Sequence, residues 1–332
     1  MPHFIEEAFE RFSKYNILII GDVMVDSYMW GKVDRISPEA PVPVLSFQKS
    51  ENRLGGAANL ALNIRALGGT PILCSVIGND FGGETLMELL RGKEMASHGI
   101  LTRNGRTSTI KTRVVSSGQQ LLRIDRETDE PLDQEAEAAF LNRILTILSN
   151  EPIDAIVFED YDKGAITPTI INKVSEWAKE KKVPIFVDPK KRNFRNYNYV
   201  TFFKPNFKEI TEGLEISLDK SDLKGLARAA KFLHTVQGIQ HVMVTLSEAG
   251  IFYSSRKQSK LLPATIRNIA DVSGAGDTVI AVATMCYVSG LEIQHVAQIA
   301  NLAGGQVCEK VGVVPVDKKQ LLEESLRVLA NS

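Results

Sequence analysis

Short, continuous apolar runs alternate along this chain with longer stretches in which apolar residues recur every three or four positions. The short runs are typical of buried strands, and the longer stretches are typical of helices that bury one face. Regular alternation of the two predicts a mostly parallel sheet covered by helices on both sides. The predicted strands are 16–20, 72–78, 155–159, 184–188, 200–204 and 241–246. The predicted helices are 5–14, 133–149, 168–181, 222–236 and about 317–330, with two more that begin at 276 and 294, and a hairpin is expected over 250–262.

Two segments break this alternation. In residues 28–50 the apolar positions are interrupted by three prolines, which suit loops and edge strands, so we expect a flap of short strands outside the main sheet. Residues 107–125 contain two strand-like runs joined by Ser116-Ser-Gly118, which is a hairpin signal. We expect these two insertions to pair as a small sheet that covers a pocket as a lid. Since no flexible linker or internal repeat divides the chain, a single domain over 1–332 is predicted.

Composition excludes several classes of partner. The 332 residues include 39 basic and 40 acidic side chains, so a net charge of −1 provides no field that would attract nucleic acid or an anionic membrane. No apolar run approaches the roughly 18 residues of a membrane span. The three cysteines are far apart and the five histidines lack metal-ligand spacing. We therefore expect a cytoplasmic protein with reduced thiols that binds small molecules.

The segment Asp271-Val-Ser-Gly-Ala-Gly-Asp277 is the strongest candidate for chemistry. Gly274 and Gly276 precede an apolar helix, whose first amides and dipole can bind an anion such as phosphate. Asp277 falls in the first helical turn, where an ionised carboxylate could take a proton from a hydroxyl that attacks phosphorus. The same pattern also fits an ordinary glycine turn followed by an acid that is favoured by the helix dipole.

Other polar residues follow the first predicted strand. Asp22 and Asp26 lie at the strand end where parallel sheets bind ligands, so they could accept hydrogen bonds from sugar hydroxyls or could cap turns. Gly55 and Gly56 would let the backbone approach a ligand, although a loop-to-helix turn explains them equally well. Asn59, near the start of the next helix, could bind a hydroxyl.

Asn206 and Glu209 follow the predicted strand 200–204 and begin a helix. Their oxygen atoms near bound phosphates would suit Mg²⁺, which usually keeps several of its own waters. An asparagine with a glutamate three residues later also fits a capping box, and the spacing alone favours the cap.

Lys190, Lys191 and Arg192 form a small basic cluster after the predicted strand 184–188. Such clusters are usually solvated, but a phosphate group of a substrate is the alternative. The segment Gly78 to Thr85 resembles a phosphate-binding loop, but Glu84 stands where that motif requires lysine. We therefore expect a strand-to-helix turn there.

These motifs together resemble those of the ribokinase-like (PfkB) carbohydrate kinases over nearly the whole chain. The two family signatures are Gly55-Gly-Ala-Ala-Asn59 and the segment 271–277, with the Asn206 and Glu209 element between them. The segment from Asp26 to Val44, which contains Arg35-Ile-Ser-Pro-Glu-Ala-Pro-Val-Pro-Val44, is similar to the heptose-7-phosphate kinases within that family. The resemblance implies a three-layer α/β/α sandwich with a mostly parallel central sheet and a small β lid, which often supports a homodimer.

The resemblance also implies roles for individual residues. Asp277 would be the general base, and the anion hole would be formed by Gly274, Ala275 and Gly276. The sugar would be held by Asp22, Asp26, Gly55, Gly56 and Asn59. ATP would be held by Asn206, Glu209, Thr245, Ser247, Gly250 and Asn301, with Mg²⁺ at Asn206 and Glu209. We infer separately that the phosphate of the substrate binds to basic residues of the lid and of the cluster, namely Lys111, Arg113, Lys190 and Arg192.

Ser247 stands where relatives usually have glycine, and a requirement for a monovalent cation stays open. The reaction implied by the resemblance is phosphorylation by ATP of the anomeric hydroxyl of D-glycero-D-manno-heptose 7-phosphate, on the route to the lipopolysaccharide core. Because the 332 residues contain no HxGH motif of a nucleotidyltransferase domain, kinase activity alone is expected. The alternatives are another sugar or sugar-phosphate kinase of this fold, of the fructose-phosphate or ribose type, a non-catalytic sugar-phosphate or nucleotide sensor, and a structural partner of a separate nucleotidyltransferase.

Overall fold

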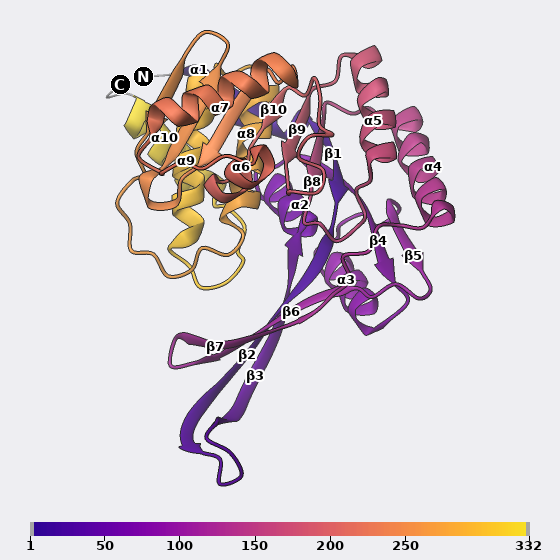
Figure 1. The fold of residues 1–332 in the computed structure, drawn as a ribbon, viewed down its shortest axis with the longest axis vertical. Helices are drawn as coiled ribbons and strands as arrows, with labels where there is room; N and C mark the ends of the chain where they lie inside the picture. The colour runs from indigo at the N-terminus through magenta and orange to yellow at the C-terminus, as the bar shows by residue number, and fades with distance from the viewer. Residues whose placement is uncertain (1–2, 330–332) are drawn as a thin grey trace.

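A nine-stranded sheet forms the centre of the computed structural model, which describes residues 3–329 (Figure 1). The sheet is parallel except at one edge, where two strands run antiparallel to their neighbours. In spatial order its strands are β13 (Ser259–Leu262), β12 (Ile251–Ser255), β11 (His241–Thr245), β10 (Phe202–Phe203), β9 (Ile185–Asp188), β8 (Ala155–Glu159), β1 (Asn16–Gly21), β4 (Thr70–Gly78) and β5 (Ile100–Arg103). The expected mostly parallel central sheet is confirmed.

Helices cover both faces of this sheet and bury two separate apolar cores. One layer contains α1 (His3–Arg11), α2 (Ala57–Ala66), α3 (Phe81–Gly92), α8 (Ala275–Val288), α9 (Ile293–Cys308) and α10 (Lys318–Leu329). The other contains α4 (Gln134–Asn150), α5 (Pro168–Lys181), α6 (Phe207–Leu214) and α7 (Leu223–Val236). None of the helices between residues 3 and 329 combines the length and the apolar character needed to cross a membrane.

Strand β1 shows why a continuous apolar run becomes a central strand. Ile17 and Ile19 belong to one core, and Leu18 and Ile20 belong to the other. Successive side chains of a strand point to opposite faces, so a strand covered on both sides needs apolar residues at every position. The predicted three-layer arrangement follows from this pattern and is confirmed.

A second sheet projects from the body of the molecule (Figure 1). Its four strands, in spatial order, are β3 (Pro43–Gly56), β2 (Val23–Ile36), β6 (Thr109–Ser116) and β7 (Gln119–Arg126). The expectation of short strands in residues 28–50 is wrong, because β2 and β3 each contain 14 residues. The prolines do not interrupt these strands: Pro38 and Pro41 lie in the connection, and Pro43 begins β3.

Strand β2 pairs in parallel with β6, so both inserted segments belong to one sheet. The hairpin between β6 and β7 turns at Ser117 and Gly118, which both have positive φ angles, of 50° and 78°. Two consecutive residues of this kind are typical of the tight turns that match strand twist. This second sheet therefore has the pairing expected for the lid.

The remaining differences from the sequence-based predictions concern element ends and one additional strand. The strand expected over 200–204 is only two residues long, and the first helix gives way to a 3₁₀ turn at Phe12–Lys14. Strand β5 was not predicted, because Ile100–Arg103 is short and half-exposed. The expected helix end at residue 330 lies outside the described residues.

Candidate active site

The candidate site lies at the carboxyl ends of neighbouring central strands. The last residues of β1, β8 and β9 are aligned, since Gly21 pairs with Glu159 and Glu159 pairs with Asp188. Asp277, in the first turn of α8, lies beside them: one oxygen atom from each of the three carboxylates falls within 4.8 Å of the others. This edge is where open α/β sheets bind ligands.

Asp277 is held by two donors from distant parts of the chain. Asn59 Nδ2 donates to its Oδ2 atom at 2.7 Å, and the Tyr161 hydroxyl donates to its Oδ1 atom at 2.6 Å. Burial raises the pKa of Asp277 to about 6, although both hydrogen bonds act in the opposite direction because they favour the charged form. At neutral pH the carboxylate is therefore mostly ionised and still basic enough to accept a proton.

The donors are themselves fixed. Asn63 Nδ2 donates to the Asn59 Oδ1 atom at 3.3 Å, and Thr278 donates to Asn63 Oδ1 at 3.2 Å, so the amide of Asn59 has its nitrogen turned towards Asp277. Burial raises the pKa of Tyr161 well above its ordinary value, so its hydroxyl stays protonated and can donate. These contacts also tie α2 to α8.

The start of α8 needs glycine for two reasons. Gly274, the N-cap residue, has a φ of 76°, and a Cβ atom there would lie 2.7 Å from Asn59 Nδ2. The Ala275 amide makes a long hydrogen bond of 3.3 Å to the Val272 carbonyl. The next first-turn amides, of Gly276 and Asp277, have no helical carbonyl to donate to, so they are free to bind an anion.

Two lysines neutralise part of the negative charge. Lys204 Nζ lies 2.8 Å from Asp188 Oδ2, and Lys190 forms an ion pair with Glu209. Burial lowers the pKa of Lys190, but the neighbouring carboxylates of Asp188 and Glu209 outweigh that effect, and the pKa is raised. Burial also lowers the pKa of Lys204, and the neighbouring carboxylates, that of Asp188 first, outweigh it, so the pKa is raised. Both side chains are therefore ammonium cations at neutral pH.

Asn206 and Glu209 form the capping box that their spacing favours. Asn206 Oδ1 accepts from the Glu209 amide at 2.8 Å, and Glu209 Oε2 accepts from the Asn206 amide at 2.7 Å. With Glu209 Oε1 also facing Lys190, this carboxylate is engaged on both oxygens. It fits a role towards the water shell of a magnesium ion better than a role as a direct ligand.

The other predicted nucleotide residues lie along the same side of the sheet. Thr245 is the last residue of β11, and it forms an isolated parallel β-bridge with Asn206. Ser247 has a φ of 55°, a backbone conformation that glycine adopts more readily than serine. Gly250 follows it with a φ of 95°, and Asn301 on α9 donates to the Pro263 carbonyl at 2.8 Å.

Among the predicted sugar residues, Asp22 already has backbone partners. Its carboxylate accepts from the amides of Tyr161, Lys163 and Ala165 at 2.9, 3.0 and 3.0 Å. These bonds hold the loop that carries the Tyr161 hydroxyl. Asp22 therefore organises the site through Tyr161, a role that its position after the first strand did not reveal.

Asp26 lies on β2, within the second sheet, and pairs with Arg113 on β6. Burial raises the pKa of Asp26, and the guanidinium of Arg113 opposes this. Gly55 makes room for it, because a Cβ atom at that position would lie 2.1 Å from Asp26 Oδ2. Gly56 has a φ of 58°, and a Cβ atom there would lie 2.5 Å from the Asp22 carbonyl oxygen.

The four basic residues predicted for the substrate phosphate each have a partner in the protein. Arg113 contacts Asp26, and Lys190 contacts Glu209. Lys111 is paired with Asp125 and Glu127 at 3.2 and 2.9 Å, and Arg192 donates to the Asp129 carbonyl at 2.6 Å. Arg113 and Lys111 share the second sheet, whereas Lys190 lies on the Glu209 side of the site.

Sequence reasoning missed four residues of this site, one of which is Asp188, the last residue of β9. The other three, Glu159, Tyr161 and Lys204, all contact or surround the carboxylate group at Asp277. A signal existed for Glu159, since an acid at the end of an otherwise apolar run needs a reason to be buried. Nothing in the sequence distinguished Tyr161 from other loop tyrosines.

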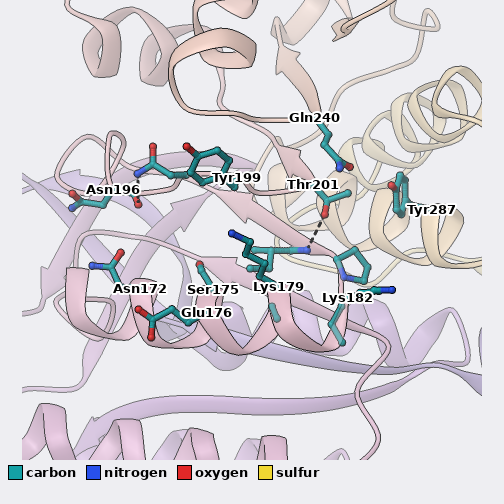
Figure 2. Close-up of a pocket in the computed structure, with 15 residues that line it drawn as sticks. Asn172, Ser175, Glu176, Lys179, Lys182, Asn196, Tyr199, Thr201, Gln240 and Tyr287 are labelled. Carbon is teal, nitrogen blue, oxygen red and sulfur yellow. Dashed lines mark hydrogen bonds between the residues drawn. The ribbon is translucent and has the colours of Figure 1, made fainter.

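A separate open cavity of about 770 Å³ lies at the opposite edge of the sheet (Figure 2). It is lined by residues near the starts of strands β9, β10 and β11, among them Ile185, Thr201 and Gln240, and by Tyr287 near the end of α8. None of the predicted site residues lines it, so it does not contribute to the chemistry described above.

Comparison with known proteins agrees with the geometry. The sequence model of the pfkB family of carbohydrate kinases matches residues 14–319. "Bifunctional protein HldE" of Pelobacter propionicus is 37% identical over 319 residues, which cover 96% of this chain and 64% of that protein. The protein of the same name from Caulobacter vibrioides is 38% identical, over 93% of this chain and 63% of that protein. The chain thus spans just under two thirds of these relatives.

Solved structures show the same fold at low identity. Phosphofructokinase-2 from Escherichia coli, solved in complex with potassium, has a TM-score of 0.78 and 17% identity over 95% of this chain and 99% of that chain. Arabidopsis thaliana ribokinase, solved with ribose and ATP, has a TM-score of 0.69 and 16% identity over 93% and 98% of the two chains. The expected ATP-dependent carbohydrate kinase is confirmed at the level of the family. Its fold, its motifs and the match over residues 14–319 place this chain in the pfkB family of carbohydrate kinases.

Proposed function

We propose that this protein transfers the γ-phosphate of ATP to the anomeric hydroxyl of D-glycero-D-manno-heptose 7-phosphate, giving the 1,7-bisphosphate. One observation supports the chemistry more than any other. Asp277 is a buried carboxylate with a pKa of about 6, held by Asn59 and Tyr161, at a helix start whose free amides face the same space. A base and an anion site are thus side by side, as phosphoryl transfer requires.

In this reaction Asp277 accepts the proton of the sugar hydroxyl while the hydroxyl oxygen attacks the γ-phosphorus. The bond between that phosphorus and the β,γ-bridging oxygen breaks, and ADP leaves. The amides of Gly276 and Asp277 donate to the oxygens of the transferred group, where negative charge develops. Closure of the second sheet over the site would exclude water, which otherwise competes as acceptor.

Magnesium bound to the phosphates of ATP would neutralise charge on the transferred group. Asn206 and Glu209 are proposed to hold that ion through its water shell, because their side-chain oxygens already accept the hydrogen bonds of the capping box. Thr245, Ser247, Gly250 and Asn301 are proposed to line the nucleotide, as the family resemblance implies.

The choice of a heptose phosphate rests on sequence similarity. The segment from Asp26 to Val44 is similar to the heptose-7-phosphate kinases, and most of it lies on β2 and β3 of the second sheet. Asp26 and Arg113 on this sheet are proposed to meet the substrate. Because Arg113 and Lys111 pair with acids here, we propose that a substrate phosphate displaces at least one of those acids.

A steady-state assay of ADP release tests this proposal. D-glycero-D-manno-heptose 7-phosphate is compared with fructose 6-phosphate and ribose at equal enzyme concentration. We expect kcat/KM to be at least about 100-fold higher for the heptose phosphate, because a site with polar groups for each hydroxyl discriminates strongly. A preference for fructose 6-phosphate or ribose would assign the protein to the alternative sugar kinases. Absence of ADP release with all three would favour a non-catalytic sensor.

We also propose a homodimer formed through the second sheet. One face of this sheet exposes apolar side chains, including Met29, Leu122 and Ile124, which are 39%, 56% and 53% exposed. Contiguous apolar surface of this kind usually marks an interaction site. Strand β7 is the last strand of this sheet, so one of its edges is unpaired, and all of its residues are exposed.

A further inference from the structure

Two neighbouring elements on one side of the central sheet carry lysine and arginine but no acidic residue. They are helix α7 and the hairpin formed by β12 and β13. Their basic residues are Lys224, Arg228 and Lys231 in the helix and Arg256, Lys257 and Lys260 in the hairpin. Neither 223–236 nor 251–262 contains an aspartate or a glutamate, although the whole chain has 40 acidic residues and 39 basic ones. A nearly neutral protein thus has a strongly positive local region.

A cavity of about 690 Å³ lies between this helix and this hairpin. Lys231, Arg256 and Lys257 line it, and no carboxylate does. Within the part of the chain that the structure describes, none of these three forms an ion pair, whereas Arg228 on the same helix faces Asp222 at 3.6 Å. Cationic groups that share one cavity repel one another, so an anion that enters the cavity is attracted by all three.

Buried hydrogen bonds hold the walls of the cavity together. His234 Nδ1 donates to the Ile239 carbonyl at 2.8 Å, since a carbonyl oxygen can only accept. His234 Nε2 lies 3.0 Å from Ser254 Oγ, which in turn lies 2.8 Å from Ser259 Oγ. This chain of contacts links α7 to both strands of the hairpin. The cavity is therefore built on regular elements and is formed before any ligand arrives.

Three positive charges favour a phosphate group over a carboxylate. A phosphate ester carries about two negative charges at neutral pH, whereas a carboxylate carries one. The planar guanidinium of Arg256 can donate to two phosphate oxygens at once, and the two lysines can act as point charges beside it. The concave shape and the volume of the cavity suit a small molecule.

The cavity is separate from the site around Asp277. Ser255 pairs with His241 at the start of β11, whereas the proposed nucleotide residue Thr245 is at the other end of that strand. The cavity also shares no lining residue with the one in Figure 2. It therefore offers a position for a ligand that neither the phosphoryl transfer nor the sugar requires.

We propose that the cavity between α7 and the β12–β13 hairpin binds a phosphorylated small molecule through Lys231, Arg256 and Lys257. The site stands apart from the reaction proposed above, and it does not depend on which sugar is phosphorylated.

The test is a titration of the whole protein with inorganic pyrophosphate, followed through the backbone amide NMR signals of residues 255–259. We expect these signals to shift to saturation, and sodium chloride of matched ionic strength should not reproduce the shifts. Lys231→Gln and Arg256→Gln should each weaken binding at least about fivefold, because each removes a charge-assisted hydrogen bond. Lys224→Gln is the matched control, since it makes the same charge change on the same helix away from the cavity, and it should stay within about twofold of the wild type.

The local signals make the outcome decisive. Shifts only near residues 274–278 would mean that pyrophosphate binds solely at the start of α8, and this would overturn the proposal. Shifts that sodium chloride reproduces would overturn it as well, and so would equal weakening in Lys224→Gln and Lys231→Gln, because the anion would then respond to the basic surface as a whole. Lys231→Arg keeps the charge and should keep binding within about threefold, which separates lost charge from a disturbed fold. A failed kinase assay would not affect these results.

Discussion

The chemistry of Asp277 depends on residues that are far away in the chain. Asn59 is 218 residues before it and Tyr161 is 116 residues before it, yet both donate to its carboxylate. Burial raises the pKa and the two donors lower it, so the value of about 6 is a balance of opposing effects. Either of the two hydrogen bonds can be removed by a single substitution.

Replacing Asp277 by asparagine should remove the base while keeping the size of the side chain. We expect kcat to fall by about 10²–10⁴-fold, the usual contribution of a general base, with the affinity for ATP largely retained. Turnover is measured by ADP release and nucleotide affinity by calorimetry. Near-normal turnover in Asp277→Asn would show that another group accepts the proton.

The pH dependence of kcat/KM should report the same carboxylate. Activity requires ionised Asp277, so kcat/KM should fall as the pH drops through about 6. Tyr161→Phe removes a hydrogen bond that favours the charged form, so the pKa of Asp277 should rise and the acid limb should move to higher pH. If the limb does not move, Tyr161 does not act through Asp277, and a purely structural role for its hydroxyl is indicated.

At the scale of elements, the site depends on how α2 and α8 meet. Both helices begin at a glycine with positive φ, Gly56 at 58° and Gly274 at 76°. Gly274 lets the start of α8 come close to Asn59, whose side chain then reaches Asp277. The close approach of these two helix starts, more than either motif separately, creates the site.

Gly274→Ala tests this packing, and Gly290→Ala is a matched control. Both glycines have positive φ, 76° and 88°, but a Cβ atom at Gly290 would meet nothing within 4 Å. The control should lose about 1–2 kcal/mol of unfolding free energy from the backbone conformation alone. Gly274→Ala should lose more, because of the contact with Asn59, and should also lower kcat. Urea unfolding and ADP release measure the two effects, and equal losses in both variants would contradict the role given to Asn59.

At the scale of the whole molecule, the second sheet leaves an apolar face unpaired. Leu122 and Ile124 on β7 lie on the same face as Met29 on β2. If this face forms the homodimer, the wild type should elute with twice the 36.6 kDa mass of one chain. Leu122→Lys and Ile124→Lys should give the monomer mass, because a lysine in an apolar interface lacks a partner.

Light scattering after size-exclusion chromatography measures these masses. Val236→Lys is the control, since Val236 at the end of α7 is 61% exposed but does not belong to the second sheet. It should leave the mass unchanged. A wild type of single-chain mass, or a Leu122→Lys variant that stays dimeric, would place the interface elsewhere or exclude it.

Much of this architecture could be predicted because local patterns carry it. Continuous apolar runs such as 16–20 and 155–159 identify strands covered on both faces, and the glycines before Asp277 mark a helix start near an anion site. The capping box at Asn206 and Glu209 was also visible in the spacing and is present. The sequence does not predict the length of β2 and β3, because three closely spaced prolines suggest short strands, whereas two of them lie in the connection and the third begins β3.

The sequence by itself determined most of the strands and helices, the family and the position of Asp277 at a helix start, since these depend on neighbouring residues. Only the tertiary structure decided that Tyr161 and Asn59 donate hydrogen bonds to that carboxylate. It also decided that Asp22 accepts hydrogen bonds from backbone amides of the 161–165 loop, and that Glu159 is buried without a hydrogen-bond partner. The hydrogen bonds join segments more than a hundred residues apart, so the spacing of residues within a motif cannot predict them. The pKa of a buried acid depends on all of its neighbours in space, so its shift from the ordinary value arises only when the chain folds.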